Sequence, residues 1–396
     1  MYPPDGMSGS RIPLRRGSFQ EFHSRGAMHG MAVLAPRKTP RGHIARRVNA
    51  VANAEFLTDL IAFSARIGAE PLLVQGGGGN TSLKRGDDLW VKASGTWLAH
   101  ARERELFVRL PLSQVRAALR HDDAEARIVD IARGLPLRPS IETSLHALLP
   151  HRVVAHVHSV NALAWAVRKD AQERMRSLLT DLNWAWVPYR RPGHPLTRAV
   201  AAAIDARAPD VPDVLVLANH GLVVGGEDCA QVAARLEAVE RRLLRAQRLA
   251  PPSQPERLRA ANDLAWQPPS EPLAHALATD AIARRIAADG VLYPDHAVFL
   301  GARAAVVGAG ERLSQAVERC LRECGAMPAF ALVEDAGVLV APESSTGAQA
   351  MLHCLALLAL RLNGDEPLAR LDADEVAALV DWDAEAYRRA LARSMN

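Results

Sequence analysis

Long apolar segments, cysteines and aromatic residues are all scarce in this 396-residue chain. No apolar run approaches the roughly 18 residues that a membrane-spanning helix needs, so we expect no membrane partner. Aromatic residues make up only 5% of the chain and no basic helix is evident, which argues against a nucleic-acid partner. The four cysteines are too few for a secreted disulfide framework, and they predict a reducing, cytoplasmic location; they are Cys229, Cys320, Cys324 and Cys354.

Lysine is also rare, and this limits the kinds of catalysis that the sequence favours. Of the 48 Lys and Arg residues, only Lys38, Lys84, Lys92 and Lys169 are lysines. Schiff-base catalysis needs a desolvated lysine on a core element. Lys84 and Lys92 fall in a predicted hairpin, and Lys169 lies near a predicted helix end, so none is expected to be suited. The sequence therefore favours metal-assisted chemistry.

The length of the chain suggests two domains. Residues 1–48 are rich in Arg, Gly and Pro and show no hydrophobic period, so they are predicted to be a disordered leader. Much of the net charge of +4 lies in this segment. We predict a main domain over 49–250, a proline-rich linker over 251–272 and a smaller C-terminal α/β domain of unassigned role over 273–396.

Apolar periodicity and turn residues predict alternating helices and strands. Helices are predicted at 52–67, 112–119, 228–249, 312–324 and 348–362, and one is predicted to open at Ser140. Strands are predicted at 71–74, 152–160, 214–218, 222–224, 297–300, 304–307 and 330–340. A hairpin is predicted with arms at 81–84 and 89–93.

Two histidines, His156 and His158, are two positions apart in the predicted strand 152–160. Alternate residues of a strand point to the same face, so both imidazoles can converge on one ion. Three nitrogen ligands with an open position are typical of catalytic zinc. His220, beside Gly221 at the end of another predicted strand, is the best candidate for the third ligand. A pair of structural histidines stays open as the alternative.

Glu142 is the candidate acid–base residue. We predict that it lies in the first turn of a helix that Ser140 caps, where the helix dipole favours a carboxylate. There it can act as a capping acid only, or it can move a proton beside a metal that stabilises an enediolate. The sequence leaves both interpretations open.

The segment 76–82 reads Gly-Gly-Gly-Gly-Asn-Thr-Ser. Its backbone amides and side-chain donors could hold a phosphate. It is not a nucleotide-binding P-loop, because no Gly-Lys-Ser/Thr follows and the segment leads into a hairpin rather than a helix. A phosphate cradle and a flexible turn both remain open.

Six short motifs occur in an order that resembles the class II aldolase/adducin family, over residues 50–250. They are Gly79-Asn80-Thr81-Ser82, Ala93-Ser94-Gly95, Pro139-Ser140-Ile141-Glu142, His156-Val157-His158, Pro188-Tyr189 and Asn219-His220-Gly221. The Pro-Ser-Ile-Glu-Thr form and the Val-Lys-Ala-Ser-Gly strand are most similar to the aldolase part of bifunctional rhamnulose-1-phosphate aldolase/dehydrogenases.

This resemblance implies a three-layer α/β/α sandwich with a mostly antiparallel central sheet. It implies a zinc-dependent aldolase that cleaves a ketose 1-phosphate, similar to rhamnulose 1-phosphate, into dihydroxyacetone phosphate and an aldehyde. Zn²⁺ would be held by His156, His158 and His220, with Glu142 as the acid–base residue.

The resemblance also implies how the substrate is held and how the chains assemble. The phosphate would be bound by Asn80, Ser94, Gly95 and Ser140. Tyr189 would donate a proton to the site of a neighbouring subunit, within a homotetramer. Fuculose-phosphate aldolases read Pro-Ser-Ser-Glu, so Ile141 removes one hydroxyl and makes phosphate binding less secure.

Other functions of the same family stay open. Sugar-phosphate epimerases and decarboxylases share the scaffold, and a non-catalytic binding protein of the adducin kind is a third possibility that the retained histidines disfavour. No dehydrogenase activity is expected, because residues 307–310, Val-Gly-Ala-Gly, lack a full dinucleotide fingerprint.

Two C-terminal stretches also look similar to the longer bifunctional group. They are Tyr293-Pro294-Asp295-His296 and residues 381–387. Neither has a role that the sequence assigns. His296 could be a ligand of a second site, but a structural histidine is the favoured interpretation.

Overall fold

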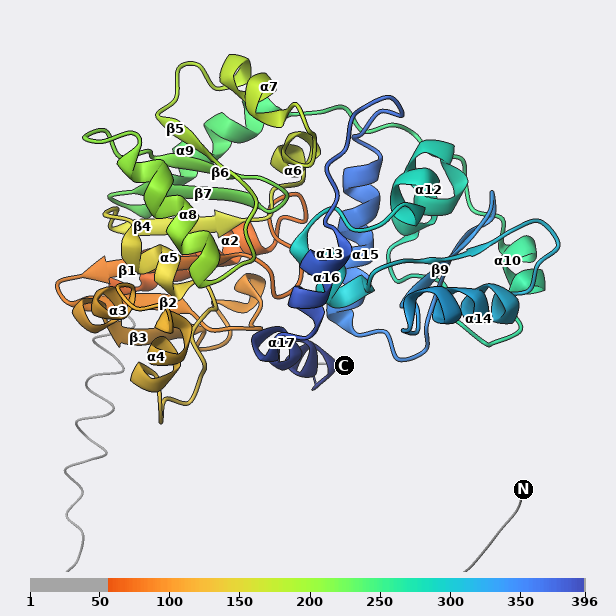
Figure 1. The fold of residues 1–396 in the computed structure, drawn as a ribbon, viewed down its shortest axis with the longest axis horizontal. Helices are drawn as coiled ribbons and strands as arrows, with labels where there is room; N and C mark the ends of the chain where they lie inside the picture. The colour runs from red at the N-terminus through yellow and green to blue at the C-terminus, as the bar shows by residue number, and fades with distance from the viewer. Residues whose placement is uncertain (1–55, 395–396) are drawn as a thin grey trace, which may run out of the picture. The chain divides into compact units, whose positions relative to one another are not determined.

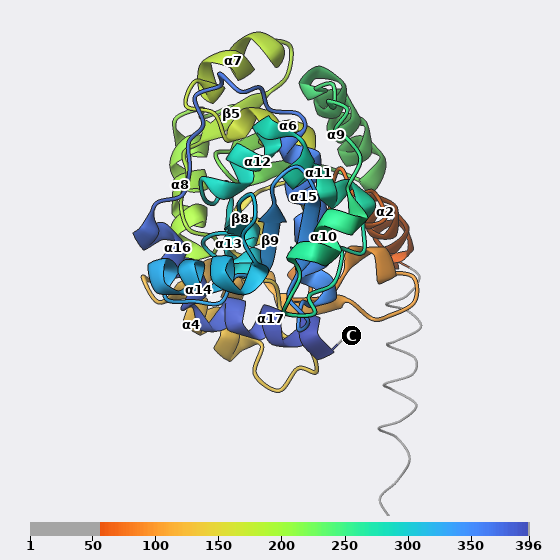
Figure 2. The same cartoon turned by 90° about the vertical axis from the view of Figure 1, so that its right-hand side faces the viewer.

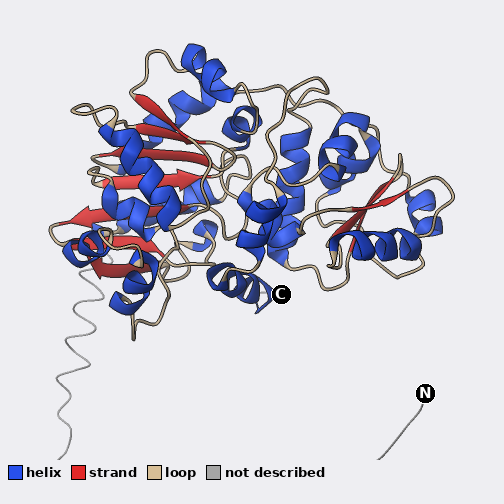
Figure 3. Ribbon diagram, viewed as in Figure 1, coloured by secondary structure: helices blue, strands red, loops and turns tan. Residues whose placement is uncertain are grey.

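A seven-stranded sheet forms the centre of the N-terminal half of the described chain (Figures 1 and 3). The structure is a computed structural model that describes residues 56–394, so the predicted leader 1–48 lies outside it. In space the strands follow the order β3-β2-β1-β4-β7-β6-β5. Their bounds are β1 (Asn80–Arg85), β2 (Asp88–Lys92), β3 (Phe107–Pro111), β4 (Val153–Val157), β5 (Trp184–Val187), β6 (Val214–Leu217) and β7 (Gly221–Gly226).

The sheet is mixed. β5 and β6 pair in parallel, whereas the other neighbours pair antiparallel. β4 lies in the middle, between β1 and β7, and its His156 lies opposite Asn80 of β1 and Val223 of β7. The central strand therefore brings a histidine and an asparagine from distant parts of the chain side by side.

Helices cover both faces of the sheet. On one face, α2 (Thr58–Gly68) and α9 (Cys229–Leu243) pack on apolar side chains of β4, β6 and β7. The opposite face is covered by α3 (Leu112–Ala118), α4 (Ala124–Ile131), α5 (Thr143–Leu148) and α8 (His194–Asp205). The remaining elements of this half are η1 (Leu98–His100), α6 (Val160–Ala166) and α7 (Ala171–Leu178).

The C-terminal half contains a second, three-stranded sheet in the order β10-β9-β8 (Figure 2). Its strands are β8 (Ala305–Val307), β9 (Phe330–Val333) and β10 (Gly337–Val340). The helices are α10 (Pro255–Ala261), η2 (Pro272–His275), α11 (Ala276–Thr279), α12 (Ala281–Ala288), α13 (Pro294–Leu300), α14 (Leu313–Cys324), α15 (Thr346–Ala359), α16 (Ala373–Val380) and α17 (Asp383–Ser394). Within residues 56–394, no helix has the length and apolar character needed to cross a membrane.

One apolar cluster joins the two halves. α15 packs against α6, and the fully buried Leu163 and Leu358 both belong to this cluster. α6 begins two residues after His158. The C-terminal elements therefore reach the part of the chain that carries the predicted metal ligands.

Local structure follows the sequence in most places. The predicted hairpin forms β1 and β2, and the amphipathic helix predicted at 228–249 is α9, with Val232, Leu236 and Val239 buried. Two predicted strands are wrong. Residues 297–300 belong to helix α13, where Pro294 at the first position favours a helical start, and residues 71–73 form a turn. The single strand predicted at 330–340 is two antiparallel strands, β9 and β10.

Candidate metal centre

Strand β4 and the residue after it carry the first two histidines. The strand was predicted to extend to residue 160 but ends at Val157, so His156 lies in the strand and His158 directly follows it. His156 Nδ1 donates a hydrogen bond of 2.9 Å to the carbonyl oxygen of Leu222 on β7. This bond leaves His156 Nε2 free to face His158, whose Nε2 is 3.1 Å away.

The turn between β6 and β7 brings in the third histidine. Asn219 has a φ of 50°, and Gly221 has a φ of 152°. A Cβ atom on Gly221 would lie only 2.3 Å from the carbonyl oxygen of Val157, so only glycine lets this turn approach the end of β4 so closely. The close approach places His220 beside His156, with ring centroids 4.8 Å apart.

The three histidines form a buried cluster. His156 is fully buried, and His158 and His220 are each 3% exposed. One ring nitrogen from each lies within 4.8 Å of the others, and within residues 56–394 this is the one group of three such side chains close enough to hold a metal ion. The structure therefore brings together the three residues predicted as metal ligands.

Burial and neighbouring charges shift the pKa values of residues in this cluster. Burial lowers the pKa of His220 to about 3 and also lowers that of His156, although the Glu142 carboxylate opposes both shifts. Burial raises the pKa of Glu142, but His156, His220 and a hydrogen bond from Asn80 outweigh it and lower the pKa to about 2. The cluster thus combines three imidazoles with a neighbouring carboxylate, a donor set that fits Zn²⁺.

Glu142 lies at the edge of this cluster. It occupies the N-cap position of α5 rather than the predicted first turn, so the prediction that Ser140 caps this helix is wrong. The Glu142 backbone N–H donates to Ser140 Oγ at 3.2 Å, just before the helix begins. Its Oε2 accepts a 2.8 Å hydrogen bond from Asn80 Nδ2 and lies 3.4 Å from His156 Nε2. Its Oε1 lies 3.6 Å from His220 Nε2 and has no hydrogen-bond partner among the described residues.

His146 supports this arrangement, although sequence reasoning had assigned no role to it. Its Nδ1 is hydrogen-bonded to Ser82 Oγ at 2.7 Å, and its Nε2 to Asn80 Oδ1. Because Asn80 also donates to Glu142, His146 orients the amide that holds the carboxylate. The signal available in the sequence was the one-turn spacing from Glu142 to His146 on a short helix.

The four residues predicted to bind phosphate line one small cavity with His158, His220 and Glu142. An isolated bridge between Ala93 and Pro139 draws two of their segments together. The cavity has a volume of about 20 Å³, and Leu391 of α17 packs on it so closely that a Cβ on Gly95 would lie 2.7 Å from the Leu391 Cδ1. The predicted phosphate-binding residues in this lining are Asn80, Ser94, Gly95 and Ser140.

Lys92 also lines this cavity, so the expectation that no lysine is desolvated is wrong. Lys92 is 2% exposed, and its Nζ donates to the carbonyl oxygens of Gly77 and Gly79, at 2.9 Å each. Burial and the charge of Arg388 lower its pKa to about 7. The hairpin was predicted, but the sequence did not show that its strands would be covered on both faces.

Two residues of the C-terminal half, Asp295 and Arg388, complete the lining of the cavity. Sequence reasoning missed both, although Asp295 lies in a stretch that looked similar to the bifunctional group and Arg388 directly follows the other such stretch, 381–387. The only signal was that similarity, because nothing in the spacing connects either residue to His158. The second-site role considered for His296 gains no support, since the buried side chain packs on the ring of Tyr293 at 4.2 Å.

Tyr189 does not line the cavity. Its side chain packs against the apolar cluster shared by the two halves, and its hydroxyl has no hydrogen-bond partner among the described residues. Burial raises its pKa above the usual value. Its role toward a neighbouring subunit stays a prediction.

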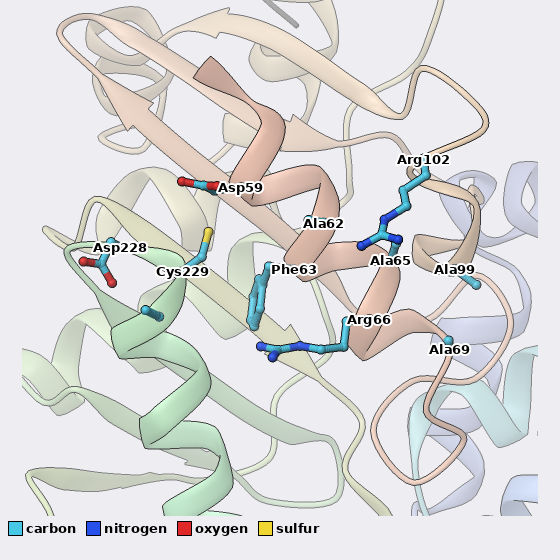
Figure 4. A pocket seen from close by; sticks show the side chains of 11 residues that line it. Asp59, Ala62, Phe63, Ala65, Arg66, Ala69, Ala99, Arg102, Asp228 and Cys229 are labelled. Carbon is cyan, nitrogen blue, oxygen red and sulfur yellow. The ribbon is translucent and has the colours of Figure 1, made fainter. Parts of the chain in front are cut away.

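A larger hollow, of about 860 Å³, lies between α2 and the start of α9 (Figure 4). Its lining includes Asp59, Arg66, Arg102 and Cys229, and none of the predicted site residues. Burial raises the pKa of the Cys229 thiol to about 11, so this side chain is a poor nucleophile at neutral pH. The hollow therefore offers no alternative catalytic cluster.

Comparison with known proteins identifies the sheet-bearing half. Residues 59–247 match the family model described as the Class II Aldolase and Adducin N-terminal domain. The chain is 33% identical over 184 residues to the "Uncharacterized oxidoreductase YuxG" of Bacillus subtilis (strain 168). This match covers 43% of this chain and 26% of the relative. The chain is 29% identical over 198 residues to a "Probable bifunctional methylthioribose-1-phosphate isomerase/methylthioribulose-1-phosphate dehydratase" of Nocardia farcinica, which covers 42% of this chain and 30% of that protein.

The chain thus spans less than a third of the length of these curated relatives. Among solved structures, the N-terminal class II aldolase domain of a Thermoplasma acidophilum protein is 28% identical with a TM-score of 0.41, and covers 47% of this chain and 90% of that one. The l-fuculose-1-phosphate aldolase of Thermus thermophilus is 16% identical with a TM-score of 0.32, and covers 47% of this chain and 92% of that one.

Proposed function

We propose that the chain, whose residues 59–247 match the class II aldolase and adducin family model, is a zinc-dependent aldolase that cleaves a ketose 1-phosphate similar to rhamnulose 1-phosphate. The observation that carries this proposal is the buried cluster of His156, His158 and His220 beside Glu142. The products would be dihydroxyacetone phosphate and an aldehyde.

The three histidines would hold the zinc. Zinc bound there would supply Lewis-acid stabilisation of the negative charge that develops on the substrate during cleavage. The protein contributes neutral imidazoles, so no proton has to leave His156 or His220 before the metal binds.

Glu142 would move the proton. Cleavage breaks the bond between C3 and C4 of the ketose, turns the C4 hydroxyl into the aldehyde and adds a proton to C3. An ionised carboxylate can take the hydroxyl proton and return it to C3, so no proton is gained or lost overall. Oε1 is the atom placed for this step, because Asn80 holds Oε2.

The phosphate would be bound by Asn80, Ser94, Gly95 and Ser140. Their shared position along one cavity wall supports this assignment. Arg388 and Lys92 add positive charge to the same lining, although Arg388 is paired with carboxylates and Lys92 with carbonyl oxygens. The anion would therefore be held mainly by uncharged donors.

Zinc content and cleavage test the proposal together. We expect the purified full-length chain to contain near-stoichiometric zinc and to lose ketose-phosphate cleavage when a chelator removes it. The double variant His156→Ala/His158→Ala should lose both, whereas His121→Ala, at an exposed histidine, should keep both. A metal-replete double variant that cleaves as fast as wild type would refute the mechanism.

A second candidate reaction is dehydration, because the Nocardia relative is named in part as a methylthioribulose-1-phosphate dehydratase. The same carboxylate could remove a C3 proton while the C4 hydroxyl leaves, which releases water and keeps the carbon chain intact. Mass spectrometry of a panel of ketose 1-phosphates and oxo-acid phosphates separates the possibilities. Two fragments mean cleavage, loss of water means dehydration, unchanged mass with a new retention time means epimerisation, and loss of carbon dioxide means decarboxylation.

The non-catalytic alternative, a binding protein of the adducin kind, makes the opposite prediction for metal. Such a protein has no need of three buried histidines beside a carboxylate. Chain prepared without chelators that holds no zinc and converts none of the panel would favour this alternative over every enzymatic one.

The proposed homotetramer would let Tyr189 serve a neighbouring site by symmetry. Mixing inactive Tyr189→Phe with inactive Glu142→Gln should then restore part of the activity, because some interfaces pair an intact tyrosine with an intact glutamate. If the two variants exchange subunits and activity does not return, Tyr189 acts within its own chain or only packs there.

A further inference from the structure

The C-terminal half places a buried carboxylate against one of the three histidines. Asp295 lies in the first turn of α13, and its Oδ2 is 3.2 Å from Nδ1 of His158. The two residues are only 2% and 3% exposed. A carboxylate at this distance from the outer nitrogen of a ligand histidine is the arrangement that fixes ring orientation in metal sites.

Asp295 is itself held in place by α17. Arg388 donates from Nη1 to Oδ1 of Asp295 at 2.9 Å and from Nη2 to Oδ2 at 3.1 Å. Its Nη1 also donates to both carboxylate oxygens of Glu385, at 2.9 Å each, and Glu385 is fully buried. The fork of donors fixes the plane of the Asp295 carboxylate, which leaves a lone pair of Oδ2 for the histidine.

The glycine loop closes over the contact between Asp295 and His158. A Cβ atom on Gly78 would lie 2.9 Å from both Asp295 Oδ2 and His158 Nδ1, so the loop backbone covers the pair directly and leaves no room for a side chain. The ring of Tyr293 lies edge-on to His158 with centroids 5.6 Å apart. These contacts exclude other orientations of the carboxylate and of the imidazole.

The three histidines differ in what their outer nitrogens meet. His156 Nδ1 donates to a backbone carbonyl, whereas neither His158 Nδ1 nor His220 Nδ1 meets the geometry of a hydrogen bond to a described residue. His158 alone has a carboxylate beside Nδ1. A carboxylate partner fixes the tautomer and makes the metal-facing nitrogen a stronger donor than a carbonyl partner does.

We propose that Asp295 is the positioning residue of His158, and that Arg388 anchors Asp295 for this task. The inference rests on the proposed zinc site, which it extends to the C-terminal half of the chain. In this arrangement His158 carries its proton on Nδ1, directed at Asp295, and presents Nε2 to the metal. The C-terminal half is then part of the metal centre.

Zinc affinity of full-length variants tests the proposal without using turnover. Asp295→Asn keeps the shape of the side chain but replaces the carboxylate, and we expect zinc to bind about 10–100-fold more weakly in competition with a chromophoric chelator. Glu366→Gln is the matched control, since Glu366 is a buried carboxylate paired with Arg168 and Arg245 that does not line the cavity, and it should bind zinc with nearly wild-type affinity. Folded Asp295→Asn with wild-type affinity, or an equal loss in Glu366→Gln, overturns the proposal.

A second measurement tests the proposal even if Asp295→Asn does not fold. In zinc-loaded wild-type protein labelled with ¹⁵N-histidine, His158, assigned through a His158→Gln variant, should carry its proton on Nδ1 and its metal on Nε2. The reverse tautomer overturns the proposal. Wild-type protein that binds no zinc overturns both this inference and the proposed function, whereas the expected zinc results without any cleavage contradict only the aldolase assignment.

Discussion

The two halves of the chain hold their parts of the metal centre in different ways. In the sheet-bearing half, hydrogen bonds to neutral groups fix the key side chains: His156 meets a backbone carbonyl and Glu142 meets the amide of Asn80. In the C-terminal half, ion pairs between buried charges fix Asp295 and Arg388. A buried charge that loses its partner is costly. We therefore expect substitutions in the first half to change the chemistry, and those in the second to change stability and metal retention.

Glu142→Gln should show the largest effect and should act on the chemical step. Loss of the proton-transferring carboxylate is expected to lower kcat by about 10²–10⁴-fold, while the variant stays folded. Steady-state kinetics and circular dichroism on the zinc-loaded protein measure both. The neighbouring Ile141→Ser is the control: Ile141 lines the same cavity but its hydrocarbon side chain cannot transfer a proton, so kcat should be kept even if substrate binding changes. Similar loss in both variants would argue against a proton-transfer role.

Arg388→Met should mainly affect folding. The change leaves the carboxylates of Asp295 and Glu385 buried without their cation, which is expected to lower the free energy of unfolding by about 3–5 kcal/mol. Urea denaturation of the metal-free protein measures this loss. Arg133→Met breaks an exposed pair with Asp130 and should cost less than about 1 kcal/mol. Equal losses of unfolding free energy in the two variants would contradict the expectation that buried ion pairs hold the C-terminal half of the site.

His146 is expected to make the free energy of unfolding depend on pH. Burial, with the charge of Lys84, lowers its pKa to about 3 in the folded protein, against an ordinary value near 6.5 in the unfolded chain. Below pH 6.5 the unfolded chain binds the additional proton, so stability falls as pH falls from 6.5 toward 3 and does not depend on this group above 6.5. Between pH 7 and pH 5 the loss from His146 alone is about 2 kcal/mol.

The variant His146→Gln isolates the contribution of His146 to the pH dependence of stability. Unfolding free energies in urea at pH 7 and pH 5 should differ less for the variant than for wild type, whatever the variant's stability at pH 7. An unchanged difference would show that His146 is not held neutral by burial.

Lys92 should show the smallest effect, and it tests whether metal or imine chemistry operates. Its lowered pKa near 7 would suit Schiff-base formation, yet its Nζ already donates to two carbonyl oxygens. We expect borohydride added with substrate to trap no covalent adduct and to leave activity unchanged. Lys92→Met is the control for any adduct detected by mass. An adduct that vanishes in this variant would replace the metal mechanism with an imine one.

The sequence could predict which side chains of the sheet-bearing half lie together, because its signals there are local. His156 and His158 lie at the end of one strand, and Glu142 follows a serine at a helix start, so short-range periodicity and capping are enough to propose them. The predicted first-turn position of Glu142 was off by one residue, since α5 begins at Thr143. His220 required only that two strands end at the same edge of a sheet.

The parts that could not be predicted depend on tertiary packing. Asp295 reaches His158 only because α15 packs on α6 and carries α13 with it, and no sequence spacing encodes that contact. The strand expected at 297–300 shows the same limit, because a short apolar run after a proline reads equally as strand or buried helix. Burial of Lys92 was missed for a related reason. The sequence pattern of a hairpin does not show whether other elements pack on one or both faces of its strands.

The contact of Leu391 with Gly95 bears on the rate at which the site can turn over. A cavity of about 20 Å³ has room for roughly one water molecule, far less than a sugar phosphate needs. For the proposed aldolase, we therefore expect α17, or the wall facing it, to move before a sugar phosphate binds and again before products leave. Such movements occur on the microsecond-to-millisecond timescale and often limit turnover. The opening of α17 would then set the turnover rate of the proposed reaction.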